Sequence, residues 1–164
     1  MKVLLVRHGA TVEDEAWAET GKADEFRPLT EDGKGKCRQS FGALKGHIEG
    51  VDTIATSPMT CGIETAEILA RVFPTVNAAT NSILKPDANA DEAIAWLTRR
   101  SPDQTVALIS HEPFLNGLIA RMCGLRDDSV AEVKHGYCAL VEFEGKPGPS
   151  HGNLLWVNQP KKKT

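Results

Sequence analysis

Near its N-terminus the chain reads KVLLVRHGAT over residues 2–11. The apolar residues 3–6 include two valines, and such a short apolar run is typical of a strand that is buried on both faces of a sheet. Arg7 and His8 follow where this strand would end, and Gly9 would let the backbone turn sharply there. Ligands gather at the carboxyl ends of strands in open α/β sheets. The stretch therefore places a cation and a titratable ring where such proteins carry their sites.

The composition is that of an ordinary globular protein. Of the 164 residues, 41% are hydrophobic and 25% are charged, which are ordinary values for a globular protein. A chain of this length buries enough surface in one domain to fold without disulfides. The net charge of −3 disfavours a nucleic-acid partner. No apolar run approaches the roughly 18 residues of a membrane span, and the first residues do not resemble a signal peptide. Because no such run is present, we expect no membrane partner. The four cysteines are scattered, so we expect reduced thiols and a cytoplasmic location.

Strand and helix patterns alternate along the chain. Strands are predicted over residues 3–6, 51–56, 75–80, 105–109, 137–143 and 154–157. Helices are predicted over about 30–47, 57–73, 87–100 and 113–123, and a polar loop covers about 11–29. This alternation predicts a three-layer α/β/α sandwich around a central sheet of about six strands. The last two strands have no helix between them, so the sheet is predicted to be mostly parallel but mixed.

Local signals set the expected boundaries of these elements. Thr30 is a good N-cap for the first helix, and Ser57 followed by Pro58 predicts that the next helix starts there. Gly124 is a good C-cap for the last helix. We expect a single domain over residues 1–158 and a frayed basic tail over 159–164.

Three predicted strand-to-helix corners carry polar residues, which read RHG at 7–9, SP at 57–58 and SHEP at 110–113. Helix N-termini attract anions through their free N–H groups and the macrodipole. Arginine binds phosphate oxygens in a bidentate fork. Two histidines and an arginine at one edge of the sheet therefore indicate a phosphate site.

Taken in order, these corners resemble the motifs of the histidine phosphatase superfamily, which has the phosphoglycerate mutase-like fold. The first corner is similar to the family's RHG signature, residues 57–67 to its second motif and residues 110–113 to its third. The short length and the run RPLT at 27–30, followed by Gly33, look most like the SixA branch, the protein phosphohistidine phosphatases. The likeness extends from Lys2 to about Trp156.

The resemblance implies a role for each matching residue. His8 would be the nucleophile that carries a covalent phosphoryl group, and Arg7 would hold the equatorial oxygens. Arg27 would clamp the phosphate from the loop, His111 would bond the transferring group, and Gly9 would lie against the substrate. A nucleophilic imidazole must be neutral, and neighbouring arginines favour that form by lowering its pKa. No metal ion or cofactor is expected.

The second motif departs from the family pattern at Cys61, where the family has an arginine that binds phosphate. Loss of one such donor costs on the order of 100- to 1,000-fold in rate. Larger members also use an acidic residue to protonate an alkoxide leaving group. Glu13, Asp14 and Glu15 lie in a suitable loop but match no motif, and we predict that they are solvated. Phosphohistidine has a good leaving group and needs less help from an acid, which favours it as the substrate.

The other cysteine and histidine candidates have simpler interpretations. His47, His135 and His151 share no metal-ligand spacing with other histidines or cysteines, so we predict surface or capping roles for them and no metal site. We interpret Cys61 as an inert small residue near a helix start. The alternative is an oxidation-sensitive thiol, because a helix N-terminus lowers the pKa of a thiol.

Three functions follow from this sequence as hypotheses. The first is a metal-independent phosphohydrolase that acts through phospho-His8 on a phosphohistidine-bearing protein of the phosphotransfer or phosphotransferase-system type. The second is a phosphate- or phosphoprotein-binding pseudoenzyme, because Cys61 replaces the second-motif arginine. The third is a small-molecule phosphomonoesterase. The sequence makes no prediction of the oligomeric state.

Overall fold

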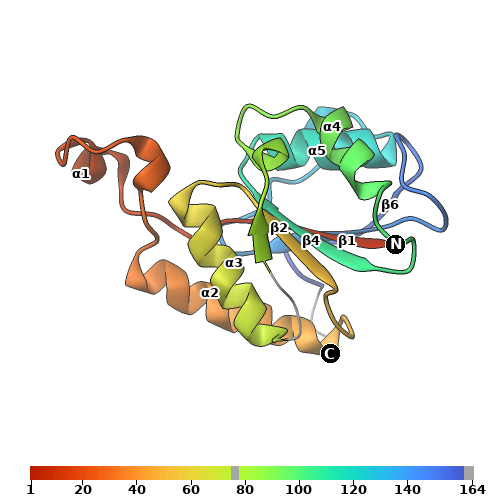
Figure 1. Cartoon of the computed structure of the whole chain (residues 1–164), viewed down its shortest axis with the longest axis horizontal. Helices are drawn as coiled ribbons and strands as arrows, with labels where there is room; N and C mark the ends of the chain where they lie inside the picture. The colour runs from red at the N-terminus through yellow and green to blue at the C-terminus, as the bar shows by residue number, and fades with distance from the viewer. Residues whose placement is uncertain (75–77, 161–164) are drawn as a thin grey trace.

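The computed structural model describes residues 1–74 and 78–160, and within them a six-stranded mixed sheet lies between two layers of helices (Figure 1). The strand order is β3-β2-β4-β1-β5-β6. The strands are β1 (Lys2–Arg7), β2 (Thr53–Thr56), β3 (Ala78–Thr80), β4 (Thr105–Ser110), β5 (Cys138–Glu142) and β6 (Asn153–Val157). Strands β1 to β4 pair in parallel, whereas β5 and β6 are antiparallel to their neighbours. The predicted three-layer sandwich with a mostly parallel, mixed sheet is confirmed.

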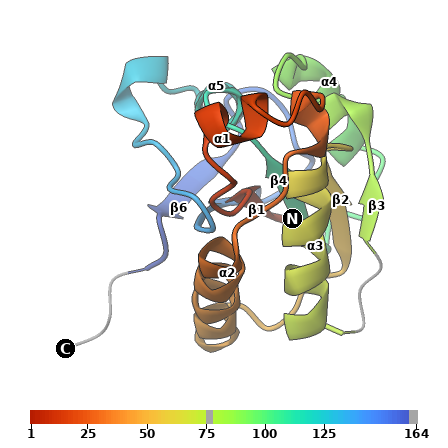
Figure 2. The ribbon, with the colours of Figure 1, turned by 90° about the vertical axis from the view of Figure 1, so that its left-hand side faces the viewer.

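Four helices cover the two faces of the sheet. Figure 2 shows α2 and α3 on one face and α4 and α5 on the other, while the short helix α1 extends beyond the end of the sheet in Figure 1. The helices are α1 (Asp14–Ala18), α2 (Glu31–Ala43), α3 (Thr60–Val72), α4 (Ala90–Leu97) and α5 (Phe114–Cys123). None of the helices in the described part of the chain is long and apolar enough to cross a membrane.

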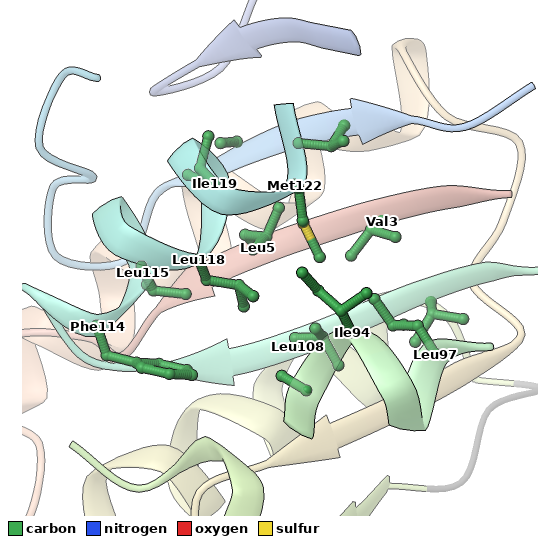
Figure 3. Close-up of a cluster of buried hydrophobic side chains, with 14 of the residues drawn as sticks. Val3, Leu5, Ile94, Leu97, Leu108, Phe114, Leu115, Leu118, Ile119 and Met122 are labelled. Atoms are coloured by element: carbon green, nitrogen blue, oxygen red, sulfur yellow. The ribbon is translucent and has the colours of Figure 1, made fainter. Parts of the chain in front are cut away.

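Strand β1 lies in the middle of the sheet and contributes to both hydrophobic cores. Val3 and Leu5 face the core beneath α4 and α5, and Figure 3 shows them against side chains of these helices. Leu4 and Val6 face the second core, beneath α2 and α3. All four side chains are fully buried, and each contributes roughly 1.5–3 kcal/mol through burial. Burial on both faces explains why this strand is an unbroken apolar run.

The helix starts differ from the predicted ones at two corners. Helix α3 starts at Thr60 rather than at Ser57, and helix α5 starts at Phe114. The Ser57 hydroxyl accepts a hydrogen bond from the Met59 N–H at 3.3 Å, but it also bonds to His111 and so forms part of a corner rather than a helix cap. Each corner therefore keeps extra non-helical residues at the edge of the sheet.

Other predicted helices begin or end where the structure has them, or are longer than the helices observed. The Thr30 hydroxyl caps α2 by accepting from the Gly33 N–H at 2.9 Å, and Gly124 ends α5 with a φ of +66°. Helix α4 is shorter than predicted, since the Asn89 side chain caps it at Asp91. The loop at 11–29 contains α1 and a 3₁₀ turn at Asp24–Phe26, which the sequence did not predict.

The predicted strand at 75–80 and the predicted tail at 159–164 are only partly described. Strand β3 lies at the sheet edge, but residues 75–77 of the predicted strand lie outside the described residues, as do residues 161–164 of the predicted tail. Gln159 was expected in that tail. Its side chain instead accepts from the Cys138 N–H at 3.0 Å and donates to the Ser40 hydroxyl at 2.7 Å. The ordered chain therefore extends past residue 158.

Helix α2 starts against the loop that leaves β1. A Cβ atom on Gly33 would lie 2.3 Å from the backbone oxygen of Ala10, a distance that only a backbone shift would relieve. A Cβ atom on Gly35, in the same helix, would lie 3.7 Å from its nearest neighbour. That neighbour is an atom at the end of the flexible Arg38 side chain. Gly33 is thus required by a close approach, whereas Gly35 is not.

We expect Gly33→Ala to lower the free energy of unfolding by about 1–3 kcal/mol, because the added methyl group forces the loop away from the helix. Gly35→Ala is the matched control and should stabilise the protein by about 0.5–1 kcal/mol through helix propensity. Urea unfolding followed by circular dichroism measures both changes. Equal effects of the two substitutions would contradict the close approach at Gly33.

Candidate active site

The strand register brings the three polar corners to one edge of the sheet. Arg7 of β1 lies opposite Ser110 of β4, and Thr56 of β2 lies opposite Ile109 of β4. The backbone continues this alignment past the strand ends, because the His8 N–H donates to the Ser110 oxygen at 3.2 Å. The corners that are distant in sequence therefore meet, as the sequence predicted.

His8 is buried at this edge, with 9% of its surface exposed. Its Nδ1 lies 2.7 Å from the carbonyl oxygen of Gly9. A carbonyl oxygen only accepts hydrogen bonds, so Nδ1 carries the proton and Nε2 keeps its lone pair. The pKa of His8 is lowered to about 3, mainly by burial; the neighbouring His111, His135 and Arg7 act in the same direction, and the bond to Gly9 opposes them. The ring is therefore neutral at physiological pH.

Two more histidines surround His8. The ring centre of His111 lies 4.9 Å away, and its Nε2 bonds to the Ser57 hydroxyl at 2.8 Å. Burial and then the charge of Arg7 lower the pKa of His111 to about 4. The ring centre of His135 lies 5.2 Å from His8, and its Nδ1 donates to the His8 backbone oxygen at 3.3 Å. His135 is exposed, as predicted, but no sequence pattern indicated that it borders this site.

A cavity of about 330 Å³ opens over these rings. Its walls carry arginine, histidine and carboxylate side chains together with one thiol: Arg7, His8, Thr11, Asp14, Asp24, Arg27, Met59, Cys61, Pro86, His111, Glu112 and His135. A larger hollow of about 470 Å³ beside α4 and α5 has no histidine or cysteine in its walls. The smaller cavity is thus the candidate site, because the titratable groups converge there.

Both predicted phosphate-binding arginines border the cavity, and both are paired with carboxylates. Arg7 Nη1 lies 3.0 Å from a carboxylate oxygen of Glu132 and donates to the Val133 backbone oxygen at 3.0 Å. Arg27 pairs with Asp14, and its Nε lies 3.3 Å from Asp24. The Asp14 side chain is 88% exposed, which agrees with the prediction of a solvated charge, and it also pairs with Arg27. A bound phosphate would have to share or replace these carboxylates.

Glu112, in the third motif, connects two segments of the chain at the cavity wall through hydrogen bonds. One of its oxygens accepts from the Asn116 N–H and the other from the Val133 N–H, each at 2.8 Å. Burial raises the pKa of this carboxyl, although both N–H donors oppose the shift. Because both oxygens are engaged, Glu112 ties α5 to the following loop and does not present a free acid to the cavity.

Gly9 supports the site from beneath and is not among the residues that border the cavity. Its N–H donates to the Thr65 hydroxyl at 3.0 Å, and its carbonyl holds His8. A Cβ atom at this position would lie 2.7 Å from Cys37 Sγ. The structure therefore gives Gly9 a packing role, since its polar groups are engaged within the protein, and its contact with substrate stays a prediction.

Cys61 lies in the first turn of α3 and borders the cavity, with 5% of its surface exposed. Its position is fixed by Thr65, whose hydroxyl donates to the Cys61 backbone oxygen at 2.7 Å. Burial raises the pKa of the Cys61 thiol to about 11 and outweighs the nearby N–H groups. The free thiol is therefore protonated and unreactive, which agrees with the inert interpretation rather than with oxidation sensitivity.

The chain matches the model of the histidine phosphatase superfamily (branch 1) over residues 3–85. A curated relative, an uncharacterized protein of Picosynechococcus, is 32% identical over 120 residues, which are 70% of this chain and 68% of the relative. The chain therefore belongs to the histidine phosphatase superfamily, a class whose membership supports phosphatase activity.

Solved structures narrow the resemblance within this class. The protein histidine phosphatase SixA complexed with tungstate is 25% identical and superposes with a TM-score of 0.80, with 95% of each chain covered. The phosphoserine phosphatase of Entamoeba histolytica in complex with 3-phosphoglyceric acid is 16% identical with a TM-score of 0.71 and 98% coverage of each chain, and it shares the fold. The chain is thus SixA-like within its superfamily.

We expect Thr65→Val to lower the free energy of unfolding by about 1–3 kcal/mol, because it leaves the buried Gly9 N–H without a partner and removes the side-chain bond to the Cys61 carbonyl. Thr65 is fully buried and valine has nearly the same shape. Thr98→Val is the control: it removes a similar bond to the Ala95 oxygen at an exposed helix end and should change stability by less than about 0.5 kcal/mol. Chemical denaturation measures the free energy of unfolding of both variants. Equally small losses in Thr65→Val and Thr98→Val would show that Thr65 is not a structural link.

Proposed function

We propose that this chain is a phosphohydrolase that removes the phosphoryl group from protein phosphohistidine. His8 carries the proposal, because it is neutral, borders the cavity, and has its Nδ1 fixed by Gly9 so that Nε2 is left as a nucleophile. Membership of the superfamily and the SixA-like structure support the reaction class. The expected partner is a phosphohistidine-bearing protein of the phosphotransfer or phosphotransferase-system type.

The proposed reaction has two displacements at phosphorus. In the first, the other ring nitrogen of the substrate phosphohistidine carries a proton taken from solvent; Nε2 of His8 attacks the phosphorus atom, and the substrate leaves as a neutral imidazole as the new N–P bond forms. In the second, water attacks phospho-His8, which releases inorganic phosphate and a proton and restores the neutral ring. Arg7, Arg27 and His111 would stabilise the charge on the transferring oxygens, as phosphoryl transfer depends mainly on positioning and charge. The scheme uses no metal ion or cofactor.

The acids around the cavity support phosphohistidine over a phosphomonoester. Glu112 has both oxygens engaged by backbone N–H groups, and Asp14 is paired with Arg27. An alkoxide leaving group requires a proton from a positioned acid. The imidazole of phosphohistidine leaves as a neutral ring once solvent has protonated its other nitrogen, so it needs less help from a positioned acid and the cavity suits that substrate better.

We expect acid-labile phosphate to appear on His8 during turnover of a phosphohistidine peptide and to be absent in His8→Ala. His47→Ala is the matched control, because His47 is exposed and does not border the cavity, and it should retain both labelling and rate. Rapid-quench trapping with mass spectrometry measures the labelling.

The same experiment separates the substrate classes. Phosphohistidine peptides should turn over at least ~10-fold faster than phosphoserine peptides or sugar phosphates, because only the latter need a general acid. The reverse order would favour the small-molecule phosphomonoesterase. Full activity of His8→Ala without labelling would falsify the proposed mechanism.

A phosphate- or phosphoprotein-binding pseudoenzyme is the second candidate, and Cys61 favours it. The cavity has a buried thiol at the position of the family's phosphate-binding arginine, and its two arginines are already paired. Such a pocket would bind a phosphorylated partner without stabilising the transition state enough for turnover.

We expect Cys61→Arg to raise the rate on phosphohistidine peptides by at least ~10-fold, because it restores a charged donor for the transferring group. Steady-state phosphate release measures the change. Cys123→Arg, on the part of α5 away from the cavity, is the charge-matched control and should leave the rate as it is. If Cys61→Arg stays inert while the unmodified chain binds phosphohistidine peptides, the binding role is correct.

A further inference from the structure

The candidate active site contains three side chains of the types that bind transition metals. His8, Cys61 and His111 each offer one ligand atom, and these atoms all lie within 4.8 Å of one another. All three residues are buried, and all three border the cavity. They come from three corners of the fold, at sequence separations that match no metal motif, and the sequence analysis did not consider them as a set of ligands.

Each ligand is already oriented by a neighbouring group. The Gly9 carbonyl holds Nδ1 of His8 at 2.7 Å, and the Ser57 hydroxyl holds Nε2 of His111 at 2.8 Å. Each ring therefore has one nitrogen left for a metal ion, and such outer hydrogen bonds commonly fix metal-bound imidazoles. Thr65 fixes the backbone that carries Cys61.

The distances suit a tetrahedral ion after a small adjustment. Zinc bonds of about 2.0–2.3 Å place tetrahedral ligand atoms roughly 3.3–3.6 Å apart. A pair of atoms at the 4.8 Å limit would have to approach by about 1.2–1.5 Å, through rotations about the side-chain bonds. Two imidazoles and a thiolate leave a fourth position open to water or an anion, as in catalytic zinc sites.

The charge around the cavity also favours a cation. Two arginines border it, but so do three carboxyl groups, those of Asp14, Asp24 and Glu112. An arginine at position 61 would have balanced these formal charges, whereas Cys61 adds a ligand without adding positive charge. Nitrogen and sulfur ligands select zinc and similar ions over Mg²⁺ and Ca²⁺, which prefer oxygen.

We propose that His8, Cys61 and His111 bind a zinc ion, and that this ion blocks phosphoryl transfer to His8. On binding, the thiol of Cys61 releases one proton to solvent and forms a sulfur–zinc bond, while the two neutral rings donate lone pairs. With Nδ1 protonated, His8 has a single lone pair, on Nε2. That lone pair bonds either to zinc or to phosphorus, so the two states exclude each other.

The inhibition rests on the proposed function, whereas the zinc site does not. We therefore test binding and turnover separately on the full chain. The protein is stripped with a chelator and titrated with Zn²⁺ against a chromogenic competitor, and Co²⁺ is used as a spectroscopic probe for a thiolate-to-metal band. The expected result is one Zn²⁺ per chain and a cobalt–thiolate band, with no response to Mg²⁺.

Variants locate the site and distinguish it from adventitious binding. Cys61→Ser and Cys61→Ala should each weaken zinc binding by at least ~100-fold and remove the cobalt band. Cys123→Ser is the matched control, because Cys123 is half-buried on α5 and does not border the cavity, and it should bind like the unmodified chain. Unchanged zinc binding in Cys61→Ser and Cys61→Ala, or no binding by the unmodified chain, overturns the zinc site.

Turnover then tests the regulation. Zn²⁺ should inhibit hydrolysis of a phosphohistidine peptide at the concentrations at which it binds, and Cys61→Arg should be resistant by at least ~100-fold. Hydrolysis that continues at saturating zinc overturns the inhibition but leaves the site standing. A chain that binds zinc through Cys61 but hydrolyses nothing defeats the proposed function, and the zinc titration is unaffected by that result.

Discussion

The hydroxyl of Thr65 joins the two segments on which the candidate site depends. It accepts from the N–H of Gly9, next to His8, and donates to the backbone oxygen of Cys61, one helical turn away on α3. The β1 corner and the start of α3 are thereby held at a fixed separation in a fully buried setting, where unpaired polar groups are costly. The distance between the nucleophile candidate and the thiol is thus set by the protein and not by a ligand.

Close packing of small residues adds to this constraint. A Cβ atom on Gly9 would lie 2.7 Å from Cys37 Sγ, and one on Gly62 would lie 2.7 Å from Thr56 Oγ1. The first glycine lets α2 approach the β1 corner, and the second lets α3 approach the end of β2. With both approaches fixed, the cavity has little freedom to widen, and its chemistry follows from which side chains border it.

The fold was largely predictable from the sequence, because a strand that is buried on both faces has an unbroken apolar sequence. The apolar run of β1 and the alternation of strands and helices both reflect contacts that every residue in the element makes. Helix starts were less predictable. Ser57 has the side chain of an N-cap, but its hydroxyl also bonds to His111 of another corner, so the helix begins three residues later at Thr60. A tertiary contact overrode a local preference there.

The candidate site was predictable only where its residues belong to contiguous motifs. His8, His111 and Arg27 border the cavity as expected. His135 and the carboxylate partner Asp24 were missed, because their closeness to the cavity depends on loops that cross from elsewhere. The link through Thr65 was missed for the same reason, although the second motif contains that residue. Local patterns identify individual groups, and the folded chain determines which groups meet.

The exchange of an arginine for Cys61 has two physical consequences that act together. It removes a positive donor from a cavity that must hold a phosphoryl group, and it places a soft ligand beside two imidazoles. Each consequence alone would weaken anion binding relative to cation binding, and Asp14, Asp24 and Glu112 at the same cavity act in the same direction. His8 would bind zinc and accept the phosphoryl group through the same lone pair. A gain in affinity for zinc therefore reduces the fraction of His8 that is free to accept a phosphoryl group. A slow phosphatase and a zinc-sensitive one would therefore have the same structural origin.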